Sequence, residues 1–264
     1  MKKILLCVSI ITIAIQILTP NLEAKELQLS KDEVQFTFFS LPDGESMLIS
    51  TGRNKQILIN TGSKHSKKHL VEQIEELGIE KIDYLILTNN QGDTCGNTDD
   101  VLDQFQVSVT ISAGKLSSSC TEEHQNVVEH RSWEQNKFYE LSPGLFFRVI
   151  KQKDHDSMSL YILFGKNSLL FLAEGDKEIE DMIQSMPIKT EILKIPEYAV
   201  KNFPSEQLLE KLDPHIAIIF NLREHILHEG LLERLQESWI DVYHLKKIGT
   251  IKILWNLTDY ELKK

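Results

Sequence analysis

Hydrophobic residues follow two recurring patterns along the chain. Short runs that are apolar at every position, or at every second position, predict β-strands. The segment Ser66–Leu77 shows the other pattern, because Leu70, Ile74 and Leu77 fall on one helical face and Gly78 ends the segment. The first pattern predicts strands at Val34–Phe39, Ser46–Ser50, Ile57–Asn60, Ile82–Leu87, Val107–Ser112, Phe138–Leu141, Leu145–Ile150, Ser159–Phe164 and Ser168–Ala173.

The last third of the chain alternates predicted helices with predicted strands. Three helix–strand pairs are expected, at Lys177–Ser185 and Glu191–Ile195, Ser205–Leu212 and Ala217–Phe220, and Gly230–Gln236 and Val242–His244. A short helix is expected at Asp99–Phe105, whereas the polar segment Ser117–Trp133 indicates no definite element. Strand runs mixed with helices on this scale predict an α/β fold whose sheets carry helices on their outer faces.

The N-terminal segment has the pattern of a secretory signal peptide. Lys2 and Lys3 precede the apolar run Ile4–Leu18, which is short for a bilayer span, and the small residue Ala24 follows. We therefore expect residues 1–24 to be removed and the mature protein to act outside the cytoplasmic membrane, without a further membrane span. The Leu-Glu-Ala ending departs from the preferred small residues, so an uncleaved N-terminal anchor stays open.

The composition is that of a globular protein, with 41% hydrophobic and 26% charged residues. No repeat or Pro/Gly-rich linker interrupts the chain, so we expect a single domain over residues 25–264. The formal net charge is −10. Nucleic-acid backbones and anionic lipids attract basic surfaces, so this charge argues against both as the main partner. An unknown protein or small molecule at the cell envelope remains as the expected partner.

Candidate chemistry begins where the apolar run Ile82–Leu87 ends. Thr88 opens a polar stretch, TNNQGDTCGN, directly after that run. Open α/β sheets bind their ligands outside the carboxyl ends of the strands, which is where this stretch is predicted to lie. An ordinary strand-to-helix turn with Asp93 as a helix cap is the alternative interpretation.

The stretch after Thr88 resembles the metallo-β-lactamase (MBL) fold family, whose motif is Thr-His-x-His-x-Asp-His followed by glycine. Thr88 and Asp93 match that motif, but the three histidine positions hold Asn89, Gln91 and Thr94. Amides and hydroxyls are poor ligands for zinc and suit harder ions. The resemblance therefore implies a recognisable frame from which most metal ligands are missing.

The predicted opening strands resemble the MBL domain of ComEC-type proteins, which carry Val-Gly-Gln-Gly-Asp-Ser and then Leu-Ile-Asp-Thr-Gly. Asp43-Gly44-Glu45-Ser46 keeps the shape of the first motif. In the second motif the aspartate of the family is replaced by Asn60. A plain β-meander would also explain both segments.

Two later segments resemble further parts of the same site. Gly175-Asp176 matches a motif whose aspartate bridges two metal ions in the family, although Asp176 would also serve as the N-cap of the following helix. In Leu193-Lys194-Ile195-Pro196 the lysine and proline of the ComEC-type motif remain. Glu197 and Tyr198 replace its two histidines. Glu197 would either ligate a hard metal or lie solvated at the surface.

Other residues are candidates on weaker grounds. His155 precedes a predicted strand, and His225 and His228 fall near the turn where the family has another histidine ligand, without its proline-flanked pattern. His155 and His228 are therefore possible additional ligands. Cys95 and Cys120 would form one disulfide in an exported chain, or would stay as two buried thiols.

The resemblance implies an αββα four-layer sandwich, with two mixed sheets face to face between helices. It also leads us to expect an exported module that has lost dinuclear zinc hydrolysis, binds no cofactor and works by binding. We assign no catalytic residue. The first alternative is a hydrolase with a rebuilt oxygen-rich site, in which Asp93, Asp176 and Glu197, with Gln91 or His155, hold Mn²⁺ or Mg²⁺ for phosphodiester cleavage. If the chain binds any cofactor, we expect a divalent metal, Zn²⁺, Mn²⁺ or Mg²⁺.

The second alternative is an interaction module of the cell envelope that works through its surface. It predicts a contiguous exposed apolar patch away from the polar loops described above.

Overall fold

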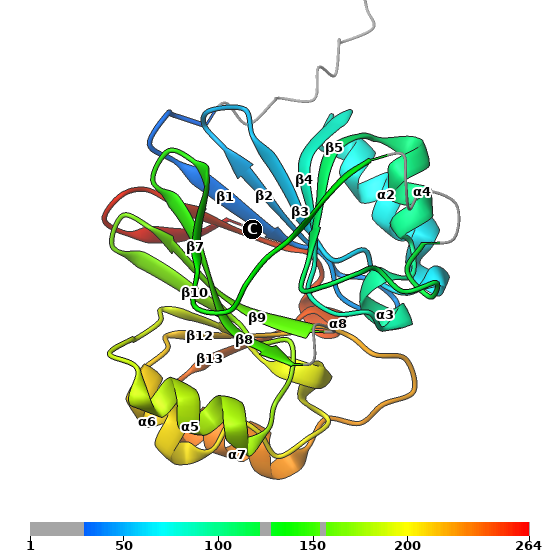
Figure 1. Ribbon diagram of the computed structural model, residues 1–264. Coiled ribbons are helices and arrows are strands. Elements are labelled where there is room, and N and C mark those ends of the chain that lie inside the picture. The colour runs from blue at the N-terminus through cyan, green and yellow to red at the C-terminus, as the bar shows by residue number, and fades with distance from the viewer. Residues whose placement is uncertain (1–28, 122–127, 154–156, 264) are drawn as a thin grey trace, which may run out of the picture.

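The computed structural model describes residues 29–121, 128–153 and 157–263. The predicted signal peptide and His155 lie outside these residues. Two β-sheets face each other, and helices cover the outer face of each sheet (Figure 1). The αββα sandwich implied by the resemblance is therefore confirmed.

Within the described residues, the first sheet has eight strands in the order β15-β14-β1-β2-β3-β4-β5-β6. Strands β3 to β6 run parallel to one another, so their carboxyl ends share one edge, and β14 returns to pair antiparallel with β1. The bounds of these strands are β1 Val34–Phe38, β2 Met47–Thr51, β3 Gln56–Ile59, β4 Lys81–Leu87, β5 Gln106–Ser112, β6 Glu129–Ser132, β14 Ile251–Trp255 and β15 Tyr260–Lys263.

The second sheet, in the part of the chain that the structure describes, has seven strands in the order β13-β12-β11-β10-β9-β8-β7. Strands β10 to β13 are parallel, whereas β7, β8, β9 and β10 form an antiparallel meander. The bounds are β7 Phe138–Ser142, β8 Leu145–Lys153, β9 Ser157–Phe164, β10 Asn167–Phe171, β11 Ile192–Lys194, β12 Ile216–Ile219 and β13 Asp241–His244.

Helices α2 and α4 pack on the first sheet, and α5, α6 and α7 pack on the second (Figure 1). Each helix buries one apolar stripe, as Leu70 and Ile74 of α2 do against Leu58 and Leu85. The helical elements are η1 Lys64–Ser66, α2 Lys67–Glu76, α3 Gly92–Cys95, α4 Thr98–Gln104, α5 Lys177–Ser185, η2 Pro196–Ala199, α6 Glu206–Leu212, α7 Glu229–Glu237 and α8 Leu245–Ile248.

The largest hydrophobic core lies between the two sheets. Phe36 of β1 and Trp255 of β14 are fully buried there, with ring centroids 4.2 Å apart. Phe147 and Ile162 of the second sheet belong to the same cluster. Because helices also cover the outer faces, inner strands such as β12 are buried on both sides, and β12 is apolar at all four of its positions.

Three local features differ from the sequence-based expectations. The polar segment Ser117–Trp133 contains the edge strand β6, whose four side chains are all exposed and so leave no hydrophobic pattern. No strand is predicted at β15, which also lies at a sheet edge, where the alternation of hydrophobic and polar residues is weak. Asp93 is not the cap of the helix after β4, because α3 begins at Gly92 and Gln91 precedes it.

Asp83 of β4 accounts for a pH-dependent part of the stability. Its Oδ1 lies 2.8 Å from Lys55 Nζ and 3.5 Å from Lys81 Nζ, and its Oδ2 accepts a 3.0 Å hydrogen bond from the Gln56 amide. Burial by itself raises the pKa of Asp83, but the Lys55 and Gln56 hydrogen bonds and the two positive charges lower that pKa below its usual value of 3.8.

We expect Asp83→Asn to lower the free energy of unfolding at pH 7 by about 1–2 kcal/mol. A carboxyl whose pKa is lower in the folded state stabilises that state above the unfolded pKa, and the contribution disappears as the pH falls through the folded pKa. Urea unfolding should therefore show a constant difference from wild type near neutral pH that shrinks below about pH 3.8. Asp213→Asn, in an exposed pair with Lys189, is the control and should change stability by less than about 0.5 kcal/mol. A difference for Asp83→Asn that grows towards acid pH would contradict the explanation.

Candidate functional site

The polar loops of the two sheets meet at the carboxyl ends of β3, β4, β10 and β11. Asn60 follows β3, Thr88 follows β4, and Lys194 is the last residue of β11 in the opposite sheet. Glu45 stands in the β1–β2 connection and completes the group. The four side chains form a buried polar cluster that joins the two sheets.

A buried ion pair is the centre of this cluster. Lys194 Nζ lies 2.5 Å from Glu45 Oε2, and their side chains are 1% and 2% exposed. The same ammonium donates a 3.0 Å hydrogen bond to the Leu172 carbonyl and lies 4.6 Å from the centroid of the Phe171 ring. Burial raises the pKa of Glu45, and the charge and hydrogen bond of Lys194 oppose that rise. Each charge therefore depends on the other for its compensation.

Asn60 connects the ion pair to the loop after β4. Its Nδ2 donates to Glu45 Oε1 and to Thr88 Oγ1, both at 2.8 Å, and its Oδ1 accepts from the Thr88 amide at 2.8 Å. Asn60 has a φ of 60°, a left-handed conformation that asparagine tolerates better than most residues. The amide of Asn60 is thus committed to hydrogen bonds within the protein.

The three positions that carry histidine in the family form a local turn here. Asn89 Oδ1 accepts hydrogen bonds from the Gln91 amide at 2.9 Å and from the Thr94 hydroxyl, which also lies 2.8 Å from the Gln91 carbonyl. Asn89 and Thr94 are buried, whereas Gln91 is exposed. The oxygen of Asn89 is therefore used to shape the turn.

Asp93 and Tyr198 connect this turn to the second sheet. The Asp93 carbonyl accepts hydrogen bonds from the Glu45 amide at 3.2 Å and from the Tyr198 hydroxyl at 3.3 Å. Burial strongly raises the pKa of Tyr198, and the nearby carboxylates of Glu45, Asp93 and Asp43 add to that rise. Tyr198 is consequently a neutral hydrogen-bond donor at physiological pH.

Glu197 and Tyr198 belong to a strained turn. Glu197, Tyr198 and Ala199 have φ values of 47°, 56° and 60°, all left-handed and all at residues other than glycine. Glu197 Oε1 pairs with Lys201 at 2.5 Å, and its Oε2 accepts from the Gly175 amide at 3.3 Å. Glu197 is therefore neither a free ligand nor a simply solvated glutamate.

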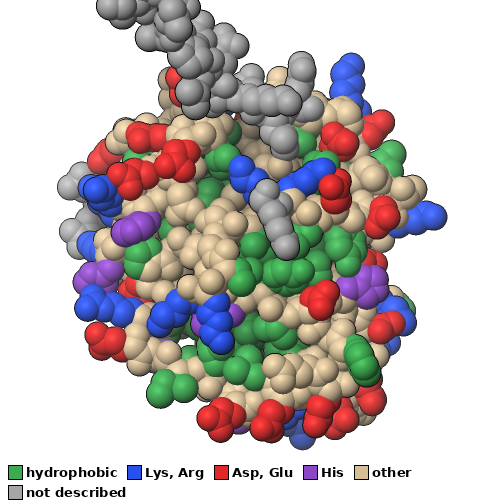
Figure 2. Space-filling model, turned by 180° about the vertical axis from the view of Figure 1, so that it is seen from behind, with side chains coloured by type: hydrophobic (Ala, Val, Ile, Leu, Met, Phe, Trp, Pro, Cys, Tyr) green, Lys and Arg blue, Asp and Glu red, His purple; other side chains and the backbone are tan. Residues whose placement is uncertain are grey.

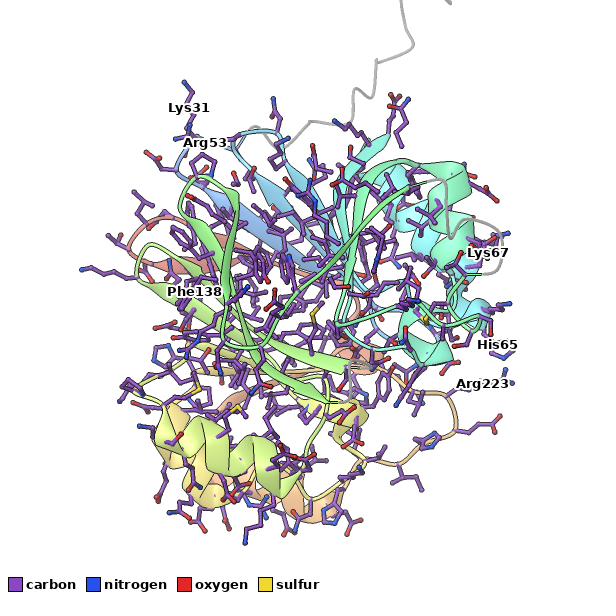
Figure 3. The ribbon with its side chains drawn as sticks, in the orientation of Figure 1. Lys31, Arg53, His65, Lys67, Phe138 and Arg223 are labelled. Carbon is purple, nitrogen blue, oxygen red and sulfur yellow. A yellow bond between two sulfur atoms is a disulfide. The ribbon has the colours of Figure 1, made fainter. Side chains whose placement is uncertain are left out.

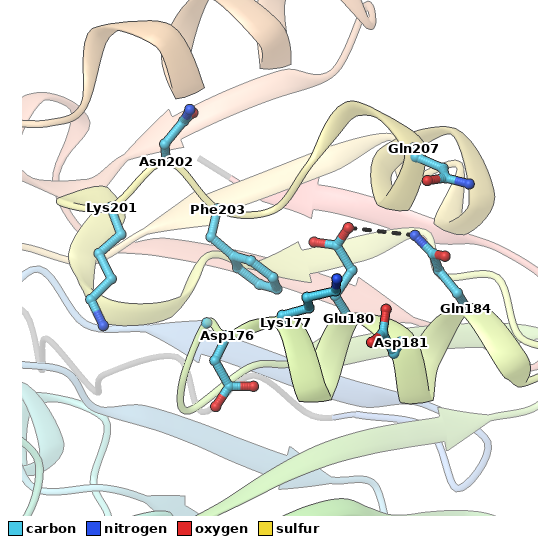
Figure 4. Close-up of a pocket in the computed structure, with 10 residues that line it drawn as sticks. Asp176, Lys177, Glu180, Asp181, Gln184, Lys201, Asn202, Phe203 and Gln207 are labelled. Carbon is cyan, nitrogen blue, oxygen red and sulfur yellow. Dashed lines mark hydrogen bonds between the residues drawn. The ribbon is translucent and has the colours of Figure 1, made fainter.

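Asp176 caps a helix, as the alternative interpretation of its motif proposed. Its Oδ1 accepts a 2.9 Å hydrogen bond from the Ile179 amide in the first turn of α5. Asp176 also lines an open pocket of about 540 Å³ between α5 and the segment before α6, with Phe203 in its wall (Figure 4). The rest of the lining is Gly175, Lys177, Glu180, Asp181, Gln184, Lys201, Asn202 and Gln207.

His228 and the cysteines bring two more segments to these loops. His228 immediately precedes α7, and its amide donates to the Ala199 carbonyl at 2.8 Å, while its buried Nδ1 has no hydrogen-bond partner among the residues that the structure describes. His225 lies in the exposed connection before α7, the segment that carries Arg223 (Figure 3). Cys95 of α3 and Cys120 are joined by a disulfide. The loop after β4 is thereby attached to the segment that follows β5.

The side chains at these positions do not fit a dinuclear metal centre. Within residues 29–121, 128–153 and 157–263, no group of three or more His, Cys, Asp or Glu side chains could hold a metal ion. The donor set is also unsuitable, because amides and hydroxyls replace imidazoles. Asp176 is used as a cap and Glu197 as a partner of Lys201.

Glu45 and Lys194 lie within the motifs described above, but the sequence pattern alone indicates no role for either residue. The available signal was Lys194 itself, a charged residue between Leu193 and Ile195 in an otherwise apolar strand. A lysine in a buried strand needs an anionic partner. The sequence offers many acidic candidates, and only the packing of the two sheets selects Glu45.

Two curated proteins are similar to this chain in sequence, and no family model matches it. ComE operon protein 3 of Bacillus subtilis is 25% identical, over 83% of this chain and 33% of that protein. Recombination protein 2 of Haemophilus influenzae is 26% identical, over 86% of this chain and 29% of that protein. The chain thus spans about a third of the length of these relatives.

Solved structures show the same fold at low sequence identity. The metallo-β-lactamase fold protein YhfI from Bacillus subtilis has a TM-score of 0.59 and 11% identity, over 81% of this chain and 96% of that one. Zn²⁺-bound PqqB from Methylobacterium extorquens has a TM-score of 0.56 and 11% identity, over 83% and 99%. The chain therefore has the metallo-β-lactamase fold, and by sequence it is a relative of the ComEC-type proteins.

Proposed function

We propose that this chain is an exported MBL-fold module that works by binding and does not use a dinuclear metal centre. The observation that carries the proposal is the use of polar atoms at the former ligand positions. Asn89 and Thr94 bond within one turn, Asp176 caps α5, and Tyr198 donates to the backbone of Asp93. These bonds connect the loops that metal ions would otherwise hold together.

The export part of the proposal is supported by the basic and apolar pattern of residues 2–18. Within the described residues, no helix combines the length and the apolar character needed to cross a bilayer. N-terminal sequencing of the protein recovered from the producing cell tests this part. A mature chain that begins after Ala24 supports it, and an intact Met1 in the cytoplasmic fraction would contradict it.

Metal analysis tests the proposed loss of the metal centre. We expect the purified protein to contain well under one zinc, manganese or iron ion per chain, because too few ligands remain for tight binding. Dialysis against a chelator should leave the thermal unfolding transition unchanged. Near-stoichiometric metal, together with phosphodiester hydrolysis that the chelator abolishes, would establish the oxygen-rich hydrolase instead.

Alanine variants of Asp93 and Asp176 distinguish a structural role of these residues from a metal-binding role. If Asp176 is only a helix cap, Asp176→Ala should lower the free energy of unfolding by about 1 kcal/mol and leave the metal content unchanged. Asp93→Ala should have a smaller effect, because the Asp93 carbonyl makes the contacts with Glu45 and Tyr198. Loss of bound metal in either variant would argue for a working metal site.

A surface-binding role is the second candidate, and one observation favours it. The exposed large hydrophobic side chains among the described residues include Trp239, Ile248 and Leu257, all in the C-terminal part of the chain. They lie on elements other than the loops after β3, β4, β10 and β11. Exposed hydrophobic side chains of this kind, where they lie together, form protein–protein interaction sites.

A further inference from the structure

The C-terminal elements carry exposed hydrophobic side chains that neither the polar loops nor the helical layers explain. Seen from behind, hydrophobic side chains gather across the middle of the molecule (Figure 2). Trp239, Ile248 and Leu257 are 95%, 48% and 44% exposed. Tyr243, Tyr260 and Leu262 are half-buried against the core between the sheets. Single exposed hydrophobics are ordinary, as Phe138 on β7 illustrates (Figure 3), whereas three exposed and three half-buried ones fall within residues 239–262.

Both sheets end on this side of the molecule. β13 is the last strand of the second sheet and β15 is the last strand of the first. Tyr260 of β15 contacts the other sheet, because its hydroxyl lies 3.1 Å from His215 Nδ1 just before β12. A terminal strand has backbone N–H and C=O groups on its outer side without a partner in the sheet, and such an edge can accept another strand.

The register of β15 decides which of its side chains face the core. Leu262 is opposite Ile253 and Tyr260 is opposite Trp255, and both of these β14 residues are fully buried. Leu262 and Tyr260 therefore point inward, while Glu261 points to the outer face. Lys263, two residues from Glu261, lies on that same outer face and forms an ion pair with it.

This arrangement is complementary to a second copy of itself. An antiparallel pairing of two β15 strands centred on Leu262 places Leu262 opposite Leu262 on the inner face. It also places Glu261 of each copy opposite Lys263 of the other on the outer face, so two opposite-charge pairs form. The inward pairing extends the core across the twofold axis at Leu262.

We propose that this chain forms a twofold symmetric dimer in which β15 of one copy pairs antiparallel with β15 of the other. The interface is isologous, so the same residues of each copy form it. Charge complementarity within the four residues Tyr260–Lys263 favours a second copy over an unrelated strand, whose charges would have no reason to match. The proposal does not depend on the state of the former metal site.

A charge-swap series in sedimentation velocity tests the proposal. We expect the wild-type chain to associate as a dimer in a concentration-dependent way. Glu261→Lys places like charges opposite each other twice and should raise the dimer dissociation constant by about tenfold or more. The double variant Glu261→Lys/Lys263→Glu restores opposite charges and should recover most of the affinity.

Glu134→Lys is the matched control, because Glu134 also forms an exposed ion pair, with Lys137, outside the proposed interface. It changes the net charge by the same amount as Glu261→Lys and should leave the association unchanged. A wild-type chain that is monomeric at every concentration would overturn the proposal. So would a double variant as weak as Glu261→Lys, or an equal effect of Glu134→Lys.

Discussion

Replacing Lys194 with methionine is expected to lower the free energy of unfolding by about 3–5 kcal/mol. Methionine fills a similar volume, so packing against Phe171 is largely kept, while Glu45 remains buried without its cation. Removing one partner of a buried ion pair is far more costly than removing both, because the remaining charge has lost its compensation. Urea unfolding of wild type and variant measures the loss, which should appear as a lower midpoint at an unchanged m-value.

The double variant Lys194→Met/Glu45→Gln is the control for this explanation. Glutamine keeps the hydrogen-bonding partner of Asn60 without a charge, so the double variant should recover most of the stability lost in Lys194→Met. A loss in Lys194→Met that the second substitution does not reduce would show that packing, rather than the uncompensated carboxylate, sets the cost.

The loss in the free energy of unfolding caused by Lys194→Met should also depend on pH. Burial raises the pKa of Glu45 above its usual value of 4.5, and without Lys194 nothing of comparable strength opposes that rise. A carboxyl with a raised folded pKa contributes stability at pH values below its unfolded pKa and loses that contribution as the pH rises through the folded pKa. The difference from the double variant should therefore be largest near neutral pH and small at about pH 4.5. A pH-independent difference would contradict this assignment.

Removing the Cys95–Cys120 disulfide is expected to cost about 3 kcal/mol, because the bond closes a loop with a sequence separation of 25 residues and restricts the unfolded chain. Alanine is the suitable replacement for both residues, since they are 0% and 3% exposed and serine would bury an unpaired hydroxyl. Urea unfolding of Cys95→Ala/Cys120→Ala should show the loss directly.

A dithiol reductant provides the matching control. Wild type unfolded in its presence should approach the stability of the double alanine variant, and the variant itself should not respond. Two titratable thiols per chain in the native oxidised protein, or equal stability of wild type and variant, would contradict the assignment. Because Cys95 follows Asp93 and Thr94 directly, the disulfide also holds the turn that replaces the former ligands.

Much of the candidate site is recognisable in the sequence as motifs, but the contacts that each side chain makes are not. Asp176 was expected as either a bridging ligand or a helix cap, and the hydrogen bond from Ile179 supports the cap. Glu197 was expected as a ligand or a solvated residue, and it pairs with Lys201 and Gly175 instead. These outcomes depend on short contacts between loops far apart in the chain, which no local pattern encodes.

The sequence alone determined the layered α/β architecture and the absence of most imidazole ligands. Buried strands and amphipathic helices carry their burial pattern in their own residues, and a missing histidine is visible directly. Only the tertiary structure decided that Lys194 faces Glu45, that β15 ends the first sheet, and that Tyr198 reaches Asp93. Each of these depends on how the two sheets pack or on which strand ends a sheet, and therefore on the whole chain rather than on any one segment.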